Sequence, residues 1–224
     1  IHIHVAEQTK EVADCLAWSG QRPVDWLLTH QPVDRRWCLI HATHMTAAET
    51  AALASSGAVA GLCPQTEANL GDGIFDGVAF ARAGGSFGIG TDSHIRVDLA
   101  EEMRTLEYSQ RLRDRARNVF AAEGASSGRF LYQRAVAGGA QALARPAPAI
   151  AVGALADIVN LDTSHPALVG RRHDALLDSF VFSADRSAVA NVYVAGREVV
   201  SGGRHVRREA IYRRFADAIR RFGE

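Results

Sequence analysis

The sequence contains almost no lysine, few cysteines and no net charge. Lys10 is the only lysine among the 25 basic residues of this 224-residue chain, and 25 acidic residues balance them. A balanced chain gives no electrostatic reason to bind nucleic acid or an anionic membrane. No apolar run approaches the roughly 20 residues of a membrane-spanning helix, and no signal-peptide pattern opens the chain. We therefore expect a cytoplasmic protein with neither a nucleic-acid nor a membrane partner.

The cysteines exclude two further classes of site. Cys15, Cys38 and Cys63 are an odd number, they stand far apart, and none belongs to a Cys-x-x-Cys pair. This spacing predicts reduced core residues and disfavours a thiolate zinc site. The chain also has no Gly-x-Gly-x-x-Gly motif that follows a strand and opens a helix, which weighs against a dinucleotide-binding sheet.

Short apolar strands alternate with helical segments over the first two-thirds of the chain. A capping box at Thr46–Glu49 opens one helix, Gly57 ends it, and Asp98 caps a long helix. Repeated β–α units of this kind predict parallel strands covered by helices. Four such units are half of a (β/α)8 barrel or most of an open doubly wound sheet. The predicted strands are 1–6, 37–42, 59–63 and 87–92.

The pattern changes after the proline-rich break at 145–148. We expect a barrel portion at 1–148, a β-rich unit at 149–206 and a terminal helix within 207–224. Because the chain opens inside a β-branched run, we also expect that an N-terminal part is missing. The predicted elements of the second part are strands at 156–161, 180–182 and 189–194, a hairpin turn at 195–197, and an amphipathic helix at 207–222.

Polar residues end three of the four predicted parallel strands. They are His4 with Glu7, then His41, then Asp92. Active sites of parallel α/β folds are built at these carboxyl ends. Each residue alone has a structural interpretation, such as a hydrogen-bonded histidine or an aspartate that caps a turn. Their coincidence in one register favours a site, and imidazole with carboxylate suits zinc or iron better than magnesium.

The order of these residues resembles the amidohydrolase superfamily, and more narrowly its branch of mononuclear-metal deaminases. The motifs that carry the resemblance are His4-Val5-Ala6-Glu7, His41 and Thr91-Asp92-Ser93-His94. The segment Gly153–Val159 is similar to a strand of the accessory β-sandwich in that superfamily. The resemblance implies the C-terminal half of a (β/α)8 TIM-type barrel, then part of a small β-sandwich and a terminal helix. It also implies that a strand-one His-x-His ligand pair is absent from this chain.

The resemblance implies a role for each site residue. His4 and Asp92 would bind one divalent metal, Zn²⁺ or iron, and Asp92 would also accept a proton from water. Glu7 would move protons to the leaving nitrogen, and His41 would polarise the reacting centre. His2 is expected to make a structural hydrogen bond. The residues expected at the substrate are Ser93, His94 and Asn69, the last of them in a turn at 69–73.

The implied reaction is hydrolytic release of ammonia from a small molecule. The expected substrate is a linear amidine, a formimidoyl group on glutamate, and the full-length enzyme is expected to be a cytoplasmic homodimer. One alternative is another deaminase or hydrolase of the branch that acts on a nucleobase or N-heterocycle. Another is a non-catalytic half-barrel module. Because two ligands rarely hold a catalytic metal, residues 1–224 alone are expected to be inactive.

Overall fold

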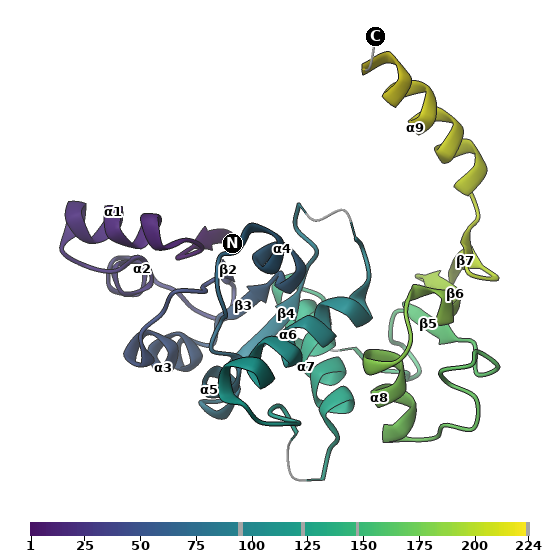
Figure 1. Ribbon diagram of the computed structural model, residues 1–224, viewed down its shortest axis with the longest axis horizontal. Coiled ribbons are helices and arrows are strands. Elements are labelled where there is room, and N and C mark those ends of the chain that lie inside the picture. Colours follow the sequence, from purple (N-terminus) through teal and green to yellow (C-terminus); the bar gives the residue numbers. More distant parts are fainter. Residues whose placement is uncertain (94–95, 122–123, 147, 223–224) are drawn as a thin grey trace.

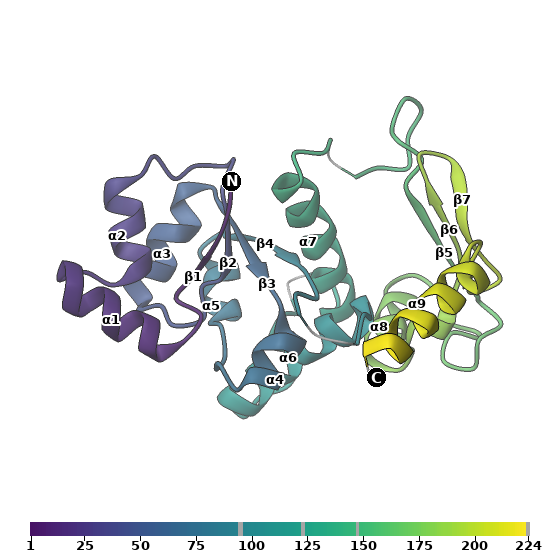
Figure 2. The ribbon, with the colours of Figure 1, turned by 90° about the horizontal axis from the view of Figure 1, so that it is seen from above.

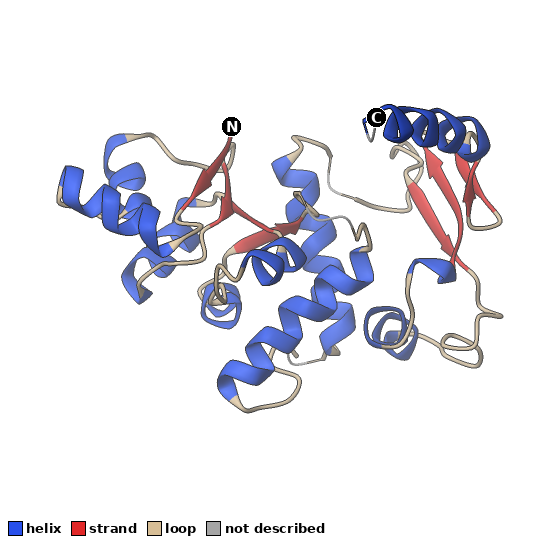
Figure 3. Cartoon of the chain, turned by 45° about the horizontal axis from the view of Figure 1, so that its top comes forward, coloured by secondary structure: helices blue, strands red, loops and turns tan. Residues whose placement is uncertain are grey.

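The computed structural model describes residues 1–93, 96–121, 124–146 and 148–222, and it contains two sheets separated by helices (Figures 1 and 3). The first sheet has four parallel strands in the order β1-β2-β3-β4, which confirms the predicted α/β class. Since all four strands run in one direction, their carboxyl ends lie along the same edge. The strands are β1 (His2–Val5), β2 (Cys38–His41), β3 (Val59–Leu62) and β4 (Ser86–Ile89).

A local capping box sets the start of one helix beside this sheet. The Thr46 hydroxyl accepts the Glu49 amide and the Glu49 side chain accepts the Thr46 amide, which forms the predicted capping box of α3. Gly57 ends α3 in the left-handed conformation, with φ of +78°. The helices α1 to α3 and α5 span Thr9–Ser19, Pro23–His30, Ala47–Ser56 and Gly77–Arg82.

The helix α4 (Pro64–Leu70) was not predicted, because Pro64 was interpreted only as the end of a strand. Proline is also favoured in the first turn of a helix, where its missing N–H has no partner to lose. The observed helix places Asn69 near its end rather than in a turn that begins at that residue. The prediction of a turn starting at Asn69 is therefore wrong.

Two long helices follow β4. Asp98 caps α6 (Leu99–Asp114) by accepting the amides of Ala100 and Glu101, as its position in the sequence predicted. The next helix, α7 (Ser127–Ala142), packs so closely on β4 that a Cβ atom on Gly138 would overlap the carbonyl oxygen of Phe87. The end of α7 also reaches β1, where Nε2 of His2 lies 2.9 Å from the carbonyl oxygen of Ala142. This contact is the structural hydrogen bond expected for His2.

The second sheet is antiparallel in the order β5-β6-β7-β8. Ala195 and Gly196 join β6 to β7 with positive φ angles of 48° and 79°, which is the geometry of a tight hairpin turn and confirms the predicted turn. The strands are β5 (Ile158–Leu161), β6 (Val189–Val194), β7 (Arg197–Ser201) and β8 (Arg204–His205), and the 3-10 helix η1 (Arg186–Ala188) leads into β6.

The strand predicted at 180–182 is wrong, because these residues form the last turn of α8 (Asp174–Phe182). Leu176 and Leu177 precede Phe180 and Val181 by one helical turn, so the apolar residues recur with a helical period. The buried Phe180 ring packs on Tyr132 of α7, with the ring centres 6.4 Å apart. Three consecutive apolar residues had not been enough to distinguish a strand from a helix.

The terminal helix α9 (Arg208–Phe222) begins close to its predicted start and has no buried residue. Figure 1 shows it projecting away from the second sheet, and in the view of Figure 2 it overlaps α8. Ile211, Phe215, Ile219 and Phe222 recur along one exposed stripe. Within the described ranges, no helix has both the length and the apolar character to cross a membrane.

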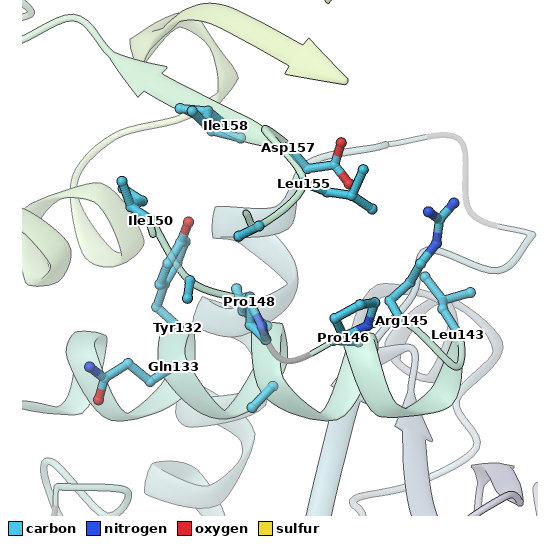
Figure 4. Close-up of a pocket in the computed structure, with 16 residues that line it drawn as sticks. Tyr132, Gln133, Leu143, Arg145, Pro146, Pro148, Ile150, Leu155, Asp157 and Ile158 are labelled. Carbon is cyan, nitrogen blue, oxygen red and sulfur yellow. The ribbon is translucent and has the colours of Figure 1, made fainter. Parts of the chain in front are cut away.

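A groove of about 750 Å³ lies between α7 and the segment that leads into β5 (Figure 4). Tyr132 and Leu143 line it on the helix side, and Ile150, Leu155 and Ile158 line it on the other. Its lining is mainly apolar and includes none of the polar residues that end the parallel strands. The polar residues that end the parallel strands lie at the edge of the first sheet, outside this groove.

Candidate metal centre

His41 lies at the end of β2 and forms the centre of a polar cluster. Its side chain is fully buried, and its Nε2 atom lies 3.2 Å from Nδ1 of His4. The same Nε2 atom lies 3.6 Å from a carboxylate oxygen of Glu7 and 3.7 Å from one of Asp92. The structure thus brings together the four residues that follow or end β1, β2 and β4.

Unusual backbone conformations help to turn these side chains toward one another. His41 and Asp92 have φ angles of 66° and 48°, and Ala6, between His4 and Glu7, has a φ of 51°. Such left-handed conformations cost a non-glycine residue about 1–3 kcal/mol and persist only where the surrounding fold imposes them. All three occur where a parallel strand ends, so the strain is concentrated around the cluster.

The other ring nitrogen of His41 has a partner that the sequence analysis did not identify. Its Nδ1 atom lies 3.2 Å from Oε1 of Glu67, which is also buried. Glu67 sits in α4, and the same oxygen accepts the amide hydrogen of Cys63 at 2.9 Å. The sequence signal that could have identified this partner is Pro64, which begins α4. A helix that starts there places Glu67 in its first turn, close to the end of β3.

The surrounding charges change the protonation of the cluster. Burial by itself lowers the pKa of His41, but its hydrogen bond to the Glu67 carboxylate and the negative charges of Glu7, Glu67 and Asp92 together raise it above its ordinary value. Burial raises the pKa of the Cys63 thiol, and the nearby carboxylates raise it further.

The donor set fits a first-row divalent metal. Ligand atoms of His4, Glu7 and His41 all lie within 4.8 Å of one another, and a second group of His41, Cys63 and Asp92 meets the same limit. Imidazole nitrogen with carboxylate oxygen is the combination that zinc and iron sites use. The side chains of Glu7 and Asp92 are 24% and 26% exposed above the buried His41, so the cluster is open to solvent on one side.

Three loops are joined beside the cluster. The side-chain amide of Gln8, after β1, donates to Oδ1 of Asp72 at 3.1 Å. Nε2 of His44, after β2, lies 2.7 Å from the carbonyl oxygen of the same Asp72. These contacts tie the segments that follow β1, β2 and α4 into one rim.

The residues expected at the substrate are placed less clearly. Ser93 follows Asp92 directly and is exposed, and Asn69 is exposed on α4. His94 lies outside the described residues. Their contact with a substrate stays a prediction.

Sequence comparison relates the chain to proteins of known activity. Residues 1–199 match the model of the Amidohydrolase family. The chain is 53% identical over 220 residues to the formimidoylglutamate deiminase of Pseudomonas aeruginosa, and the match covers 98% of this chain and 49% of that protein. The chain therefore spans about half the length of this curated relative.

Two solved structures share the fold over almost the whole chain. An amidohydrolase from Brucella melitensis is 52% identical, with a TM-score of 0.94 over 100% of this chain and 49% of that protein. An adenosine deaminase from Xanthomonas campestris with bound zinc is 28% identical, with a TM-score of 0.84 over 98% of this chain and 50% of that protein. The first similarity covers the whole chain and therefore includes the sheet edge that carries the histidine–carboxylate cluster.

Proposed function

The chain belongs to the amidohydrolase family, and we propose that it forms part of a metal-dependent deaminase that hydrolyses N-formimidoyl-L-glutamate to N-formyl-L-glutamate and ammonia. The observation that carries the proposal is the convergence of His4, Glu7 and Asp92 on Nε2 of the buried His41. The identity of 53% to formimidoylglutamate deiminase supports the substrate. Such an activity would serve histidine degradation in the whole protein.

We propose further that residues 1–148 are half of a (β/α)8 barrel. Four parallel strands in sequence order support this architecture, because a complete barrel has eight. Residues 149–206, with the antiparallel sheet, would be part of an accessory β-sandwich, and 207–224 would be a terminal helix. The likeness to proteins of about twice this length is consistent with that division.

His4 and Asp92 would hold one divalent metal, with zinc as the first candidate and iron as the second. The zinc bound by the adenosine deaminase from Xanthomonas campestris supports zinc. When bound, such a metal supplies an activated water molecule at neutral pH. Glu7 would remain free of the metal to act on protons.

The side chains of the cluster would each take a separate role in proton transfer or charge stabilisation. Asp92 would accept a proton from water, and Glu7 would deliver one to the departing nitrogen. A carbon–oxygen bond forms at the formimidoyl carbon, the carbon–nitrogen bond breaks, and ammonia leaves with the electron pair. His41 would polarise the attacked centre through Nε2, the ring nitrogen that faces His4, Glu7 and Asp92. The carboxylate of Glu7 would also attract the cationic formimidoyl group.

Ammonia release by the zinc-loaded whole protein tests this function. We expect turnover of N-formimidoyl-L-glutamate, with N-formyl-L-glutamate identified as the product by NMR. Guanine, cytosine and adenosine are the competing substrates, because the likeness to an adenosine deaminase favours a nucleobase rival. Preferential turnover of one of these would replace the proposed substrate. Absence of turnover with every compound would favour a non-catalytic module.

A further inference from the structure

We propose that Glu67 is a positioning residue that holds the His41 ring in one orientation and one tautomer, with Nδ1–H donated to Glu67 and Nε2 turned toward His4, Glu7 and Asp92. The inference rests on the proposed function for its catalytic consequence, but its structural part does not depend on any substrate. His41 and Glu67 are 26 positions apart in the sequence, and their contact joins the end of β2 to α4.

The contacts of the ring define a single orientation. Nδ1 of His41 lies 3.2 Å from Glu67, and Nε2 lies 3.2 Å from Nδ1 of His4. A half-turn of the ring would replace both nitrogens with carbon atoms and remove both contacts. The ring also has no freedom to move into solvent, because the side chain is fully buried.

The anchoring of Glu67 decides which group carries the hydrogen. Its Oε1 atom already accepts the amide hydrogen of Cys63 at 2.9 Å, so that oxygen is held as an acceptor. The hydrogen between Glu67 and His41 must then come from the imidazole, which leaves Nε2 with a free electron pair in the neutral ring. Burial of a carboxylate destabilises the fold unless its oxygens accept hydrogen bonds. In the described structure, Oε1 of Glu67 has two such partners, the Cys63 amide and the His41 ring.

Glu49 provides a matched control within the same chain. It is also buried, and its Oε2 atom accepts the amide hydrogen of Thr46, the residue that caps its own helix, at 2.8 Å. Its charged partner is Arg22, at 2.7 Å, rather than a histidine of the cluster. Substitution at Glu49 therefore removes a buried glutamate and a helix cap without touching His41.

Nitrogen NMR of the metal-free chain of residues 1–224 tests the structural part. The spectra are recorded at a pH where the imidazoles are neutral. We expect His41 to carry its hydrogen on Nδ1 in the wild-type chain and on Nε2 in Glu67→Ala. Glu67→Gln should retain the Nδ1 hydrogen, because its amide oxygen still accepts it, and Glu49→Ala should also retain it. An Nε2 hydrogen in the wild type, or an unchanged tautomer in Glu67→Ala, would overturn the proposal.

Steady-state kinetics of the zinc-loaded whole protein test the catalytic part. Loss of the partner that orients a catalytic group commonly costs about 10–100-fold, and we expect Glu67→Ala to lower kcat by that factor with KM and zinc content unchanged. Glu49→Ala should lower the melting temperature but not kcat. Equal kcat values for the two variants would refute the positioning role. Because the NMR measurement uses neither metal nor substrate, failure of the proposed reaction would leave its result intact.

Discussion

Nδ1 of His4 lies 3.2 Å from Nε2 of His41, and the two rings meet edge to face, although 37 positions separate the residues in sequence. Two imidazole nitrogens at this distance can share a hydrogen, or a metal ion that binds one of them can lie beside the other. The pair is formed because β1 and β2 are neighbouring parallel strands in which Val5 pairs with His41. The sheet register thus brings the two histidines together before any ligand binds.

Removal of either proposed ligand should remove the metal. We expect His4→Ala and Asp92→Ala to lower zinc affinity by more than about 100-fold, which exceeds the usual cost of losing only the partner of a ligand. Elemental analysis after dialysis against a fixed zinc concentration measures the effect. His205→Ala, on the exposed strand β8, is the control and should bind zinc as the wild type does. Full zinc content in Asp92→Ala would contradict its role as a ligand.

Glu7 should matter for turnover and not for the metal. Glu7→Gln keeps the size of the side chain but cannot transfer a proton, so we expect kcat to fall by about 10²–10⁴-fold, the usual contribution of a general acid–base group. Zinc content should not change. The comparison is made on samples with measured metal loading, and a kcat close to that of the wild type would exclude Glu7 as the proton carrier.

Glu102 should make folding less stable as pH rises. It is fully buried on α6, one carboxylate oxygen accepts the Gln65 amide at 2.9 Å, and the other has no hydrogen-bond partner in the described part of the chain. Burial, together with nearby carboxylates such as Glu67, raises the pKa of Glu102 from 4.5 to about 7. The folded state therefore holds this proton more tightly than the unfolded state. The resulting stabilisation is complete below pH 4.5 and is lost as pH rises through 7.

Urea unfolding at pH 5 and pH 8 measures this effect. A pKa shift of this size corresponds to about 3 kcal/mol of unfolding free energy. Glu102→Gln should abolish most of that pH dependence, because its amide is neutral at both values. Glu209→Gln, at an exposed position of α9, should leave it unchanged. The same pH dependence in Glu102→Gln and the wild type would show that another group is responsible.

The three thiols should differ in reactivity. The prediction of three core cysteines is confirmed for Cys38 and Cys63 but wrong for Cys15, which is only half-buried on α1. Burial raises the pKa of Cys38 to about 11, and burial with nearby carboxylates raises that of Cys63. Since the thiolate is the reactive form, a thiol reagent at pH 8 should modify Cys15 first.

Mass spectrometry of peptides from the briefly labelled native protein identifies the modified residue. Cys15→Ser should remove the fast phase, and all three cysteines of the wild type should react in urea. Rapid labelling of Cys63 in the native protein would be inconsistent with its buried position beside His41.

Elements with local end signals were predicted well. Thr46 with Glu49 defined the start of α3, and Asp98 defined the start of α6, because a helix cap is a contact between residues close in sequence. The elements that were predicted wrongly, or not at all, have ambiguous local signals. Pro64 suits both the end of a strand and the start of a helix, and the run at 180–182 has no period of its own.

The sequence by itself determined that His4, His41 and Asp92 would lie at one edge, because residues that end successive parallel strands share that edge in any α/β sheet. Only the tertiary structure decided that the backbone is left-handed at His41 and Asp92, and that Glu67 meets the second nitrogen of His41. Those features depend on strand register and on how α4 packs after β3. Contacts between residues distant in sequence are fixed by packing, and no local pattern of residues encodes them.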